Sequence, residues 1–341
     1  MARVLIEAAV KIVLLLGVML TTIAYMTWVE RRVSAWIQDR RGPNRVGPFG
    51  LLQPLADGIK FLFKEAIVPP HAFRPIYLLA PVLIFVPSLV TFAVVPFGPT
   101  LPLFETTIRL QVADVGNGIL IVLAFSSLGV YGIALAGWSS NNKYSLMGGL
   151  RSSAQLISYE LAMGMAIVGV LMSTGSLRLS EVVAHQAAHG WNVLWQLPGF
   201  LVFLTAAFAE TNRLPFDLPE AETELVAGYH TEYSGMRFSM FYMAEYANMI
   251  TASALAATLY FGGYHVPGLA RLGLPAWGEA LAQVAAFCVK VACFLFVYVW
   301  VRWTLPRFRY DQLMNLGWKV LLPIALGHIL WVSFLVLRGW A

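Results

Sequence analysis

Charged residues are scarce in this chain. Asp, Glu, Lys and Arg make up 12% of the 341 residues, whereas 59% are hydrophobic. Soluble domains usually contain about 25% charged residues, so this composition excludes an ordinary soluble domain. Short segments of alternating apolar and polar residues are also absent, and this excludes a transmembrane β-barrel.

Cysteine is nearly absent as well. The two cysteines, Cys288 and Cys293, lie in one apolar segment. An iron–sulfur cluster needs about four such ligands, so the chain holds no cluster of its own. His185 and His189 are four residues apart without an obvious third ligand, and we expect no metal. The sequence has neither a phosphate-binding glycine loop nor a nucleophile–histidine arrangement, so we expect no catalytic residue; any electron carriers belong to other chains.

Long apolar runs are the main positive feature. A helix needs ~20 apolar residues to cross a bilayer. The chain is therefore predicted to be an all-α polytopic membrane protein, with one integral membrane domain over 1–341. Its eight predicted spans are 6–29, 77–97, 116–137, 156–175, 194–212, 239–262, 280–302 and 319–338.

The basic residues give this arrangement a direction. The first, third, fifth and seventh connections hold 16 Lys and Arg, whereas the even connections and the termini hold 6. Because basic residues accumulate on the cytoplasmic side, we expect the odd connections to be cytoplasmic. In the first connection, 51–65 has apolar residues on one helical face and Gln53, Asp57, Lys60 and Lys64 on another. This pattern predicts an amphipathic helix at the membrane interface or against a partner.

The acidic residues are concentrated in one stretch. Seven of the 18 Asp and Glu residues fall between Glu210 and Glu245. Carboxylates near a bilayer are costly and usually face a protein interior or a wet cavity. Clustered carboxylates also raise one another's pKa, which favours a proton path. A structural pairing of Arg213 with Asp217 or a glutamate remains an alternative at this point.

Several long motifs make the chain recognisable. They are VERR (29–32), QDRRGPNRVGPFGLLQPLADGIKFLFKE (38–65), GWSSNNKYSLMGGLRSSAQLISYE (137–160), AETNRLPFDLPEAETELVAGYHTEYSGMRF (209–238), FYMAEYANM (241–249) and PRFRYDQLM (306–314). Together they resemble the H subunits of proton-pumping NADH:quinone oxidoreductase, respiratory complex I, over nearly the whole chain. One departure is His230, where many members of that family have Asn.

The resemblance implies a role in quinone reduction. It implies that the chain forms the membrane part of a quinone chamber, couples quinone reduction to proton translocation, and depends on partner subunits that carry flavin and iron–sulfur clusters. The residues implied for the chamber wall and entrance are Arg31, Arg40, Asp57, Lys60, Arg213, Phe238 and Arg302. Those implied for the proton path are Glu30, Glu160, Glu210, Glu220, Glu222, Glu224, Glu232 and Glu245. The division between the two sets is open, because both meet in the fifth connection.

The expected partners are the other membrane and peripheral subunits of the complex, quinone and membrane lipids, with no nucleic acid. The expected location is the bacterial inner (plasma) membrane, or the mitochondrial inner membrane if the chain is organellar. Two alternatives stay open. One is the membrane anchor of an energy-converting hydrogenase, which the unbroken 38–65 motif disfavours. The other is a stand-alone proton-coupled transporter, which the lack of an internal repeat disfavours.

Overall fold

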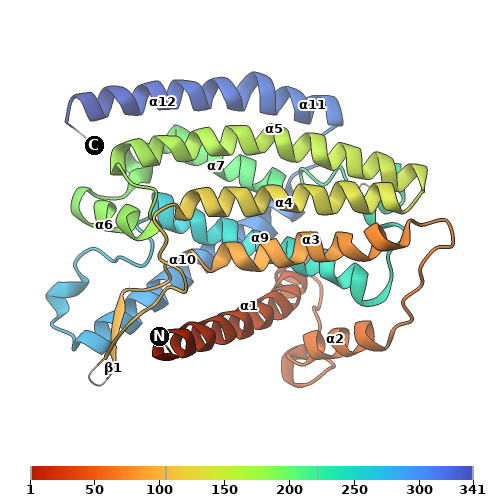
Figure 1. Ribbon diagram of the computed structural model, residues 1–341, viewed down its shortest axis with the longest axis horizontal. Coiled ribbons are helices and arrows are strands. Elements are labelled where there is room, and N and C mark those ends of the chain that lie inside the picture. Colours follow the sequence, from red (N-terminus) through yellow and green to blue (C-terminus); the bar gives the residue numbers. More distant parts are fainter. Residues whose placement is uncertain (1, 104–105, 221, 340–341) are drawn as a thin grey trace.

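The computed structural model describes residues 2–103, 106–220 and 222–339, and nearly all of its regular structure is helical (Figure 1). The α-helices are α1 (Ala2–Ile37), α2 (Gln53–Phe63), α3 (Arg74–Phe92), α4 (Gly118–Ser139), α5 (Lys143–Thr174), α6 (Leu179–His189), α7 (Leu197–Glu210), α8 (Glu222–Leu225), α9 (Gly235–Tyr260), α10 (Ala276–Thr304), α11 (Tyr310–Asn315) and α12 (Leu322–Leu337). A π-helical segment, Leu316–Leu321, joins α11 to α12. Short 3₁₀ turns are Pro48–Gly50, Asn192–Leu194, Gly228–His230 and Leu269–Leu272.

Each of the eight predicted spans overlaps a helix. Six of these helices are long and apolar enough to cross a membrane: α1, α3, α4, α5, α10 and the continuous α11–α12. This confirms the all-α polytopic class. The other two are α7 and α9. With 14 residues, α7 extends only about 21 Å, short of the ~30 Å hydrocarbon core. The longer α9 packs against α3, α7 and α10, so most of its surface faces protein and it needs no apolar exterior. That these two also cross the membrane stays a prediction.

Several boundaries differ from the predicted ones. Helix α1 continues to Ile37, and α5 begins at Lys143, 13 residues before the predicted span. Asn142 starts α5 by accepting a hydrogen bond on its side chain from the Tyr144 amide at 2.9 Å. The even connections also contain regular structure: α6, and an antiparallel hairpin of β1 (Thr100–Leu103) and β2 (Thr106–Arg109), with Thr100 opposite Arg109. The amphipathic helix predicted within 51–65 is α2.

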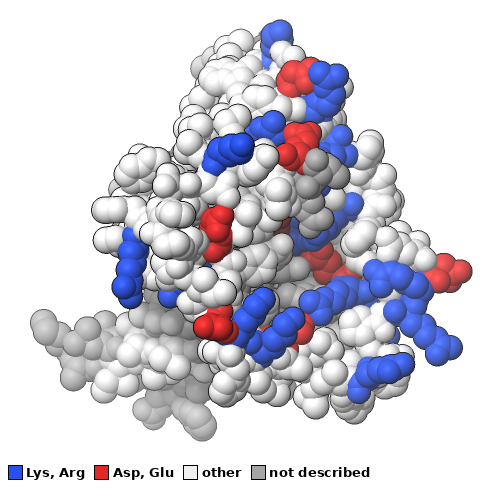
Figure 2. Space-filling model, turned by 90° about the vertical axis from the view of Figure 1, so that its right-hand side faces the viewer, with Lys and Arg blue, Asp and Glu red and all other residues white. Residues whose placement is uncertain are grey.

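The long helices run side by side, and this separates the connections into two groups (Figure 1). Helix α2, the start of α5 and α11 lie at one end of the molecule, whereas α6, the β-hairpin and both termini lie at the other. The first end is the one that carries the odd connections. Figure 2 looks onto it and shows Lys and Arg side chains spread across the face with acidic side chains between them.

The chain after α7 is irregular yet buried. Asn212 has a φ of 50°, and the helix does not continue into Pro215. Buried carbonyls need hydrogen-bond donors, and the side chain of Gln155 on α5 supplies them. Its amide nitrogen lies 2.8 Å from the Ala209 carbonyl oxygen and 2.9 Å from that of Phe216. One polar side chain thus fixes the segment that carries Arg213.

Candidate functional site: a charged cavity and a buried row of carboxylates

A large cavity lies between α1, α2, α9 and α10, at the end of the molecule that carries the odd connections. We call it the main cavity; its volume is about 440 Å³. Of the predicted chamber residues, Arg31, Arg40, Asp57, Phe238 and Arg302 line it, and so does Glu30. Aromatic residues complete the wall: Phe61, Tyr242, Tyr246 and Trp303.

The outer wall of the main cavity is held by an ion pair between two helices. Arg31 on α1 donates to the Asp57 carboxylate on α2 at 2.8 Å, and Gln53 donates to the same carboxylate at 3.0 Å. The Arg31 side chain is 53% exposed, so this pair contributes at most about 1 kcal/mol of stability. Its main consequence is positional, since it fixes the amphipathic helix against α1.

The inner wall is centred on Glu30. Its carboxylate accepts hydrogen bonds from Arg213 Nη1 at 2.8 and 3.0 Å and from the Tyr246 hydroxyl at 2.7 Å. Arg302 on α10 donates to it as well. The Glu30 side chain is buried, whereas that of Arg302 is 33% exposed and faces the cavity. A buried carboxylate is stable only with such partners, and here they come from three segments: the connection after α7, α9 and α10.

Arg213 lies behind this wall and does not line the main cavity. The residue is only 4% exposed. Its guanidinium pairs with Glu30 on one side and with Glu245 on the other, and it stacks over the Tyr246 ring at 4.5 Å. Of the pairings that the sequence left open, Arg213 therefore pairs with two glutamates and not with Asp217. Asp217 instead accepts from Arg307 at 2.8 Å.

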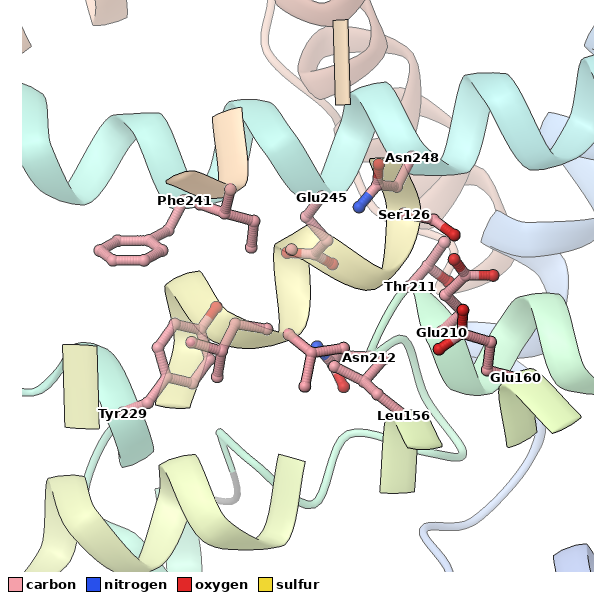
Figure 3. Close-up of a pocket in the computed structure, with 14 residues that line it drawn as sticks. Ser126, Leu156, Glu160, Glu210, Thr211, Asn212, Tyr229, Phe241, Glu245 and Asn248 are labelled. Carbon is pink, nitrogen blue, oxygen red and sulfur yellow. The ribbon is translucent and has the colours of Figure 1, made fainter. Parts of the chain in front are cut away.

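A second, much smaller cavity continues from Glu245. We call it the acid pocket; its volume of about 30 Å³ is close to that of one water molecule. Figure 3 shows Glu160, Glu210 and Glu245 around it, together with Ser126, Thr211, Asn212 and Asn248. Ser127, the neighbour of Ser126, donates to the Glu160 carboxylate. Three of the predicted proton-path residues thus converge from α5, α7 and α9.

Glu220 lies in the connection beside these acids. The Tyr229 hydroxyl, whose ring lines the acid pocket, is 3.4 Å from its carboxylate. Burial raises the pKa of Glu220 well above its usual range, and the negative charges of Glu245 and Asp217 raise it further. Burial also raises the pKa of Asp217, although Arg307 opposes the shift.

Three predicted residues lie apart from both cavities. Glu224 is half exposed and pairs with Arg151 at 2.6 Å. Glu232 accepts a hydrogen bond from Asn142 at 2.6 Å. Lys60 is on the exposed side of α2, with its ammonium 5.9 Å from the Phe61 ring centre. Glu222 begins α8, but its side chain lies outside the described part of the structure.

Sequence reasoning included Phe238 but missed the other aromatic residues of the site. Phe238, Tyr242 and Tyr246 all line the main cavity, and Tyr246 also bonds Glu30. Their spacing of four places them on one face of a helix, so the periodicity of the 238–246 segment was the available signal. Ser127 and Arg307 had no comparable signal, because their partners are 33 and 90 residues away in the sequence.

The fold and the site define a polytopic helical membrane protein with a charged cavity joined to a buried row of carboxylates. Residues 10–333 match the NADH dehydrogenase family. The NADH-quinone oxidoreductase H subunit 2 of Koribacter versatilis is 52% identical over 97% of this chain and 97% of its own length. The corresponding H subunit of Leptospira biflexa is 52% identical over 97% and 96%, and the H subunit 1 of Cytophaga hutchinsonii is 48% identical over 96% and 95%.

The chain therefore belongs to the family of NADH-quinone oxidoreductase H subunits. This membership confirms the resemblance found in the motifs, and with it the prediction that the chain is part of an enzyme.

Proposed function

We propose that this chain holds the quinone head group in the main cavity and couples its reduction to proton translocation, as the H subunit of NADH-quinone oxidoreductase. One observation carries the proposal. Glu30 at the cavity wall forms an ion pair with Arg213, Arg213 forms a second ion pair with Glu245, and Glu245 lines the acid pocket with Glu210 and Glu160. A charge change in the main cavity therefore has a continuous set of charged contacts along which it can act.

The main cavity suits a quinone head group. Its volume falls within the roughly 300–1,000 Å³ typical of small-molecule sites, which combine apolar walls with a few placed polar groups. Phe61, Phe238 and Trp303 offer apolar surface to a flat ring. The Arg31 and Arg302 guanidiniums offer donors to its carbonyl oxygens.

Reduction of a quinone would disturb the inner wall through charge. Two electrons and two protons convert a quinone to a quinol, and negative charge forms when an electron arrives before its proton. At an effective dielectric constant of about 20, a negative charge ~4 Å from a guanidinium is worth about 4 kcal/mol. Such a charge would compete with Glu30 for Arg302, and the strength of the Glu30–Arg213 and Arg213–Glu245 pairs would change in response.

This function requires partners. NADH oxidation needs flavin and iron–sulfur carriers, and we place these in peripheral subunits of the complex. The basic face in Figure 2, beside the main cavity, is the surface on which we expect them to dock. Membrane subunits and lipids would cover the exposed apolar sides of the helices, in the bacterial inner membrane.

The test uses the intact purified complex. Arg302→Met removes one cavity donor, and a hydrogen bond to a charged group is worth about 1.5–3 kcal/mol. We expect the KM for quinone to rise roughly tenfold or more, while NADH oxidation by ferricyanide is unchanged. Arg309→Met is the matched control, since the Arg309 side chain is 79% exposed and pairs only with its neighbour Asp311 among the described residues.

A photoreactive quinone gives an independent readout. We expect it to label the 238–246 segment, and excess quinone should prevent the labelling. An unchanged KM in Arg302→Met together with no labelling of the cavity residues would overturn the assignment of this cavity to quinone.

A further inference from the structure

The ion pairs between the two cavities cannot pass a proton. Arg213 stands between Glu30 and Glu245, and an arginine side chain stays protonated at any physiological pH. It can transmit an electrostatic change, but it cannot give up a proton to a neighbour. If protons move between the main cavity and the acid pocket, they need a second connection made of groups that titrate.

His230 is placed to supply that connection. It ends the 3₁₀ turn Gly228–His230, is 6% exposed, and has no hydrogen-bond partner for Nδ1 among the described residues. On one side its ring packs edgewise against Phe238 at 5.1 Å and Tyr242 at 5.9 Å, both of which line the main cavity. On the other side, Nδ1 lies 3.7 Å from a Glu220 carboxylate oxygen.

Glu220 continues the connection to the acid pocket. The same carboxylate oxygen is 3.4 Å from the hydroxyl of Tyr229, which lines that pocket (Figure 3). A route therefore leads from the main cavity through His230, Glu220 and Tyr229 to the acid pocket. It runs beside the Arg213 ion pairs. The titratable and charged groups that surround it are Arg213, Asp217 and Arg307 in the connections, Tyr242 and Glu245 on α9, and Arg302 on α10.

We propose that His230 and Glu220 form a proton-carrying connection between the main cavity and the acid pocket. This rests on the proposed function, because negative charge on the quinone is what draws the proton. The O–H bond of the Glu220 carboxyl breaks and an N–H bond forms at His230 Nδ1, which leaves a carboxylate beside the acid pocket and an imidazolium beside the main cavity. The imidazolium then releases its Nε2 proton towards the main cavity, where the reduced quinone takes it up, and His230 returns to its neutral form. Glu220 regains its proton from the acid pocket through the Tyr229 hydroxyl.

At rest, the connection holds one proton donor and one proton acceptor. Burial lowers the pKa of His230 to about 4 and raises that of Glu220, so at neutral pH the histidine rests neutral and the carboxyl rests protonated. This order of pKa values opposes the transfer at rest, and negative charge on the quinone, by raising the pKa of His230, is what allows it. The 3.7 Å gap exceeds a hydrogen bond. The transfer therefore requires a rotation of the Glu220 side chain that brings the two atoms within hydrogen-bond distance.

The first experiment uses His230→Asn in the intact complex. General acid–base groups contribute about 10²–10⁴ in rate, and we expect the quinone-linked kcat to fall at least tenfold, because this chain, unlike the family members that have Asn here, relies on the histidine for this transfer. The KM for quinone should stay unchanged, since His230 is not among the residues that line the main cavity. His189→Asn is the matched control, because His189 is exposed on α6 at the opposite end of α5. A normal kcat in His230→Asn overturns the proposal.

Chemical rescue separates proton transfer from packing. In His230→Ala, added imidazole should restore part of the lost rate, whereas pyrrole, which has the same shape but no basic nitrogen, should not. Equal rescue by both compounds overturns the proposal and assigns His230 a space-filling role.

A third variant covers the case in which His230→Ala does not assemble. Glu220→Gln should show the same loss as His230→Asn, and the double variant should be no slower than either, because both interrupt one connection. Additive losses overturn the proposal. In every variant the photoreactive quinone should still label the main cavity. Loss of labelling in the wild-type complex would instead refute the proposed function, so the two failures are distinguishable.

Discussion

Replacing Arg213 by methionine tests the ion-pair connection most directly. Arg213 is 4% exposed and neutralises two carboxylates at once, those of Glu30 and Glu245. Methionine fills a similar volume without charge. Removing one partner of a buried ion pair costs about 3–5 kcal/mol, because the remaining charge stays buried without compensation.

The structure predicts which carboxylate bears this cost. Glu30 keeps Arg302 and the Tyr246 hydroxyl when Arg213 is lost. Glu245 loses the partner of its ion pair. We therefore expect Arg213→Met to lower the stability of the complex by about 3–5 kcal/mol, and Glu245→Gln in the same chain to restore most of it. Glu30→Gln should restore much less.

The assay is the thermal midpoint of the detergent-purified complex, measured on the wild type, the three single variants and the two double variants. Quinone-linked turnover should fall in Arg213→Met while ferricyanide reduction persists. If Glu30→Gln proves the better rescuer, or if both double variants show additive losses, the assignment of Arg213 as the bridge between these two acids is wrong.

Three further predictions concern the acids, the topology and pH. Glu160→Gln and Glu210→Gln keep size and hydrogen bonding but remove titration, so turnover with quinone and proton pumping should both fall; normal pumping in the double variant would leave these residues a structural role. A cysteine at Lys143 should react with an impermeant thiol reagent only from the cytoplasmic side and one at His189 only from the opposite side, and the reverse pattern would invert the orientation. Burial lowers the pKa of His230 from 6.5 to about 4, so between these values the unfolded state binds more protons than the folded state. The contribution of neutral His230 to the free energy of unfolding is therefore fully present above pH 6.5, and about 3 kcal/mol of it is lost as the pH drops towards 4. Hydrogen exchange of 228–233 should accelerate over this pH window in the wild type but not in His230→Asn.

The sequence predicted the helices well because apolar length is a local property. A run of about 20 apolar residues must be helical in a bilayer whatever its neighbours are. The same logic failed at the start of α5, where residues 143–155 are polar enough to suggest a connection but are helical. There the surrounding protein, including the close approach of Gly137 to the Ser145 backbone and of Gly148 to Tyr229, supports a helix that bilayer arguments do not anticipate.

The candidate site was predictable only as a set of residues. Motifs and buried charge were enough to single out Glu30, Arg213, Glu245 and Arg302. Composition and spacing gave no sign that they form one cluster, or that Arg213 lies behind the cavity wall and bridges two acids.

By itself the sequence determined the class of protein, the two groups of connections and the presence of acids that need a protein interior, because these follow from hydropathy and from charge along the chain. The tertiary structure alone decided which charges pair. Glu30 and Arg213 are 183 residues apart, and Glu30 and Arg302 are 272 residues apart. Such contacts depend on how α1, α9 and α10 pack around the irregular segment after α7, and that packing is a property of the whole fold.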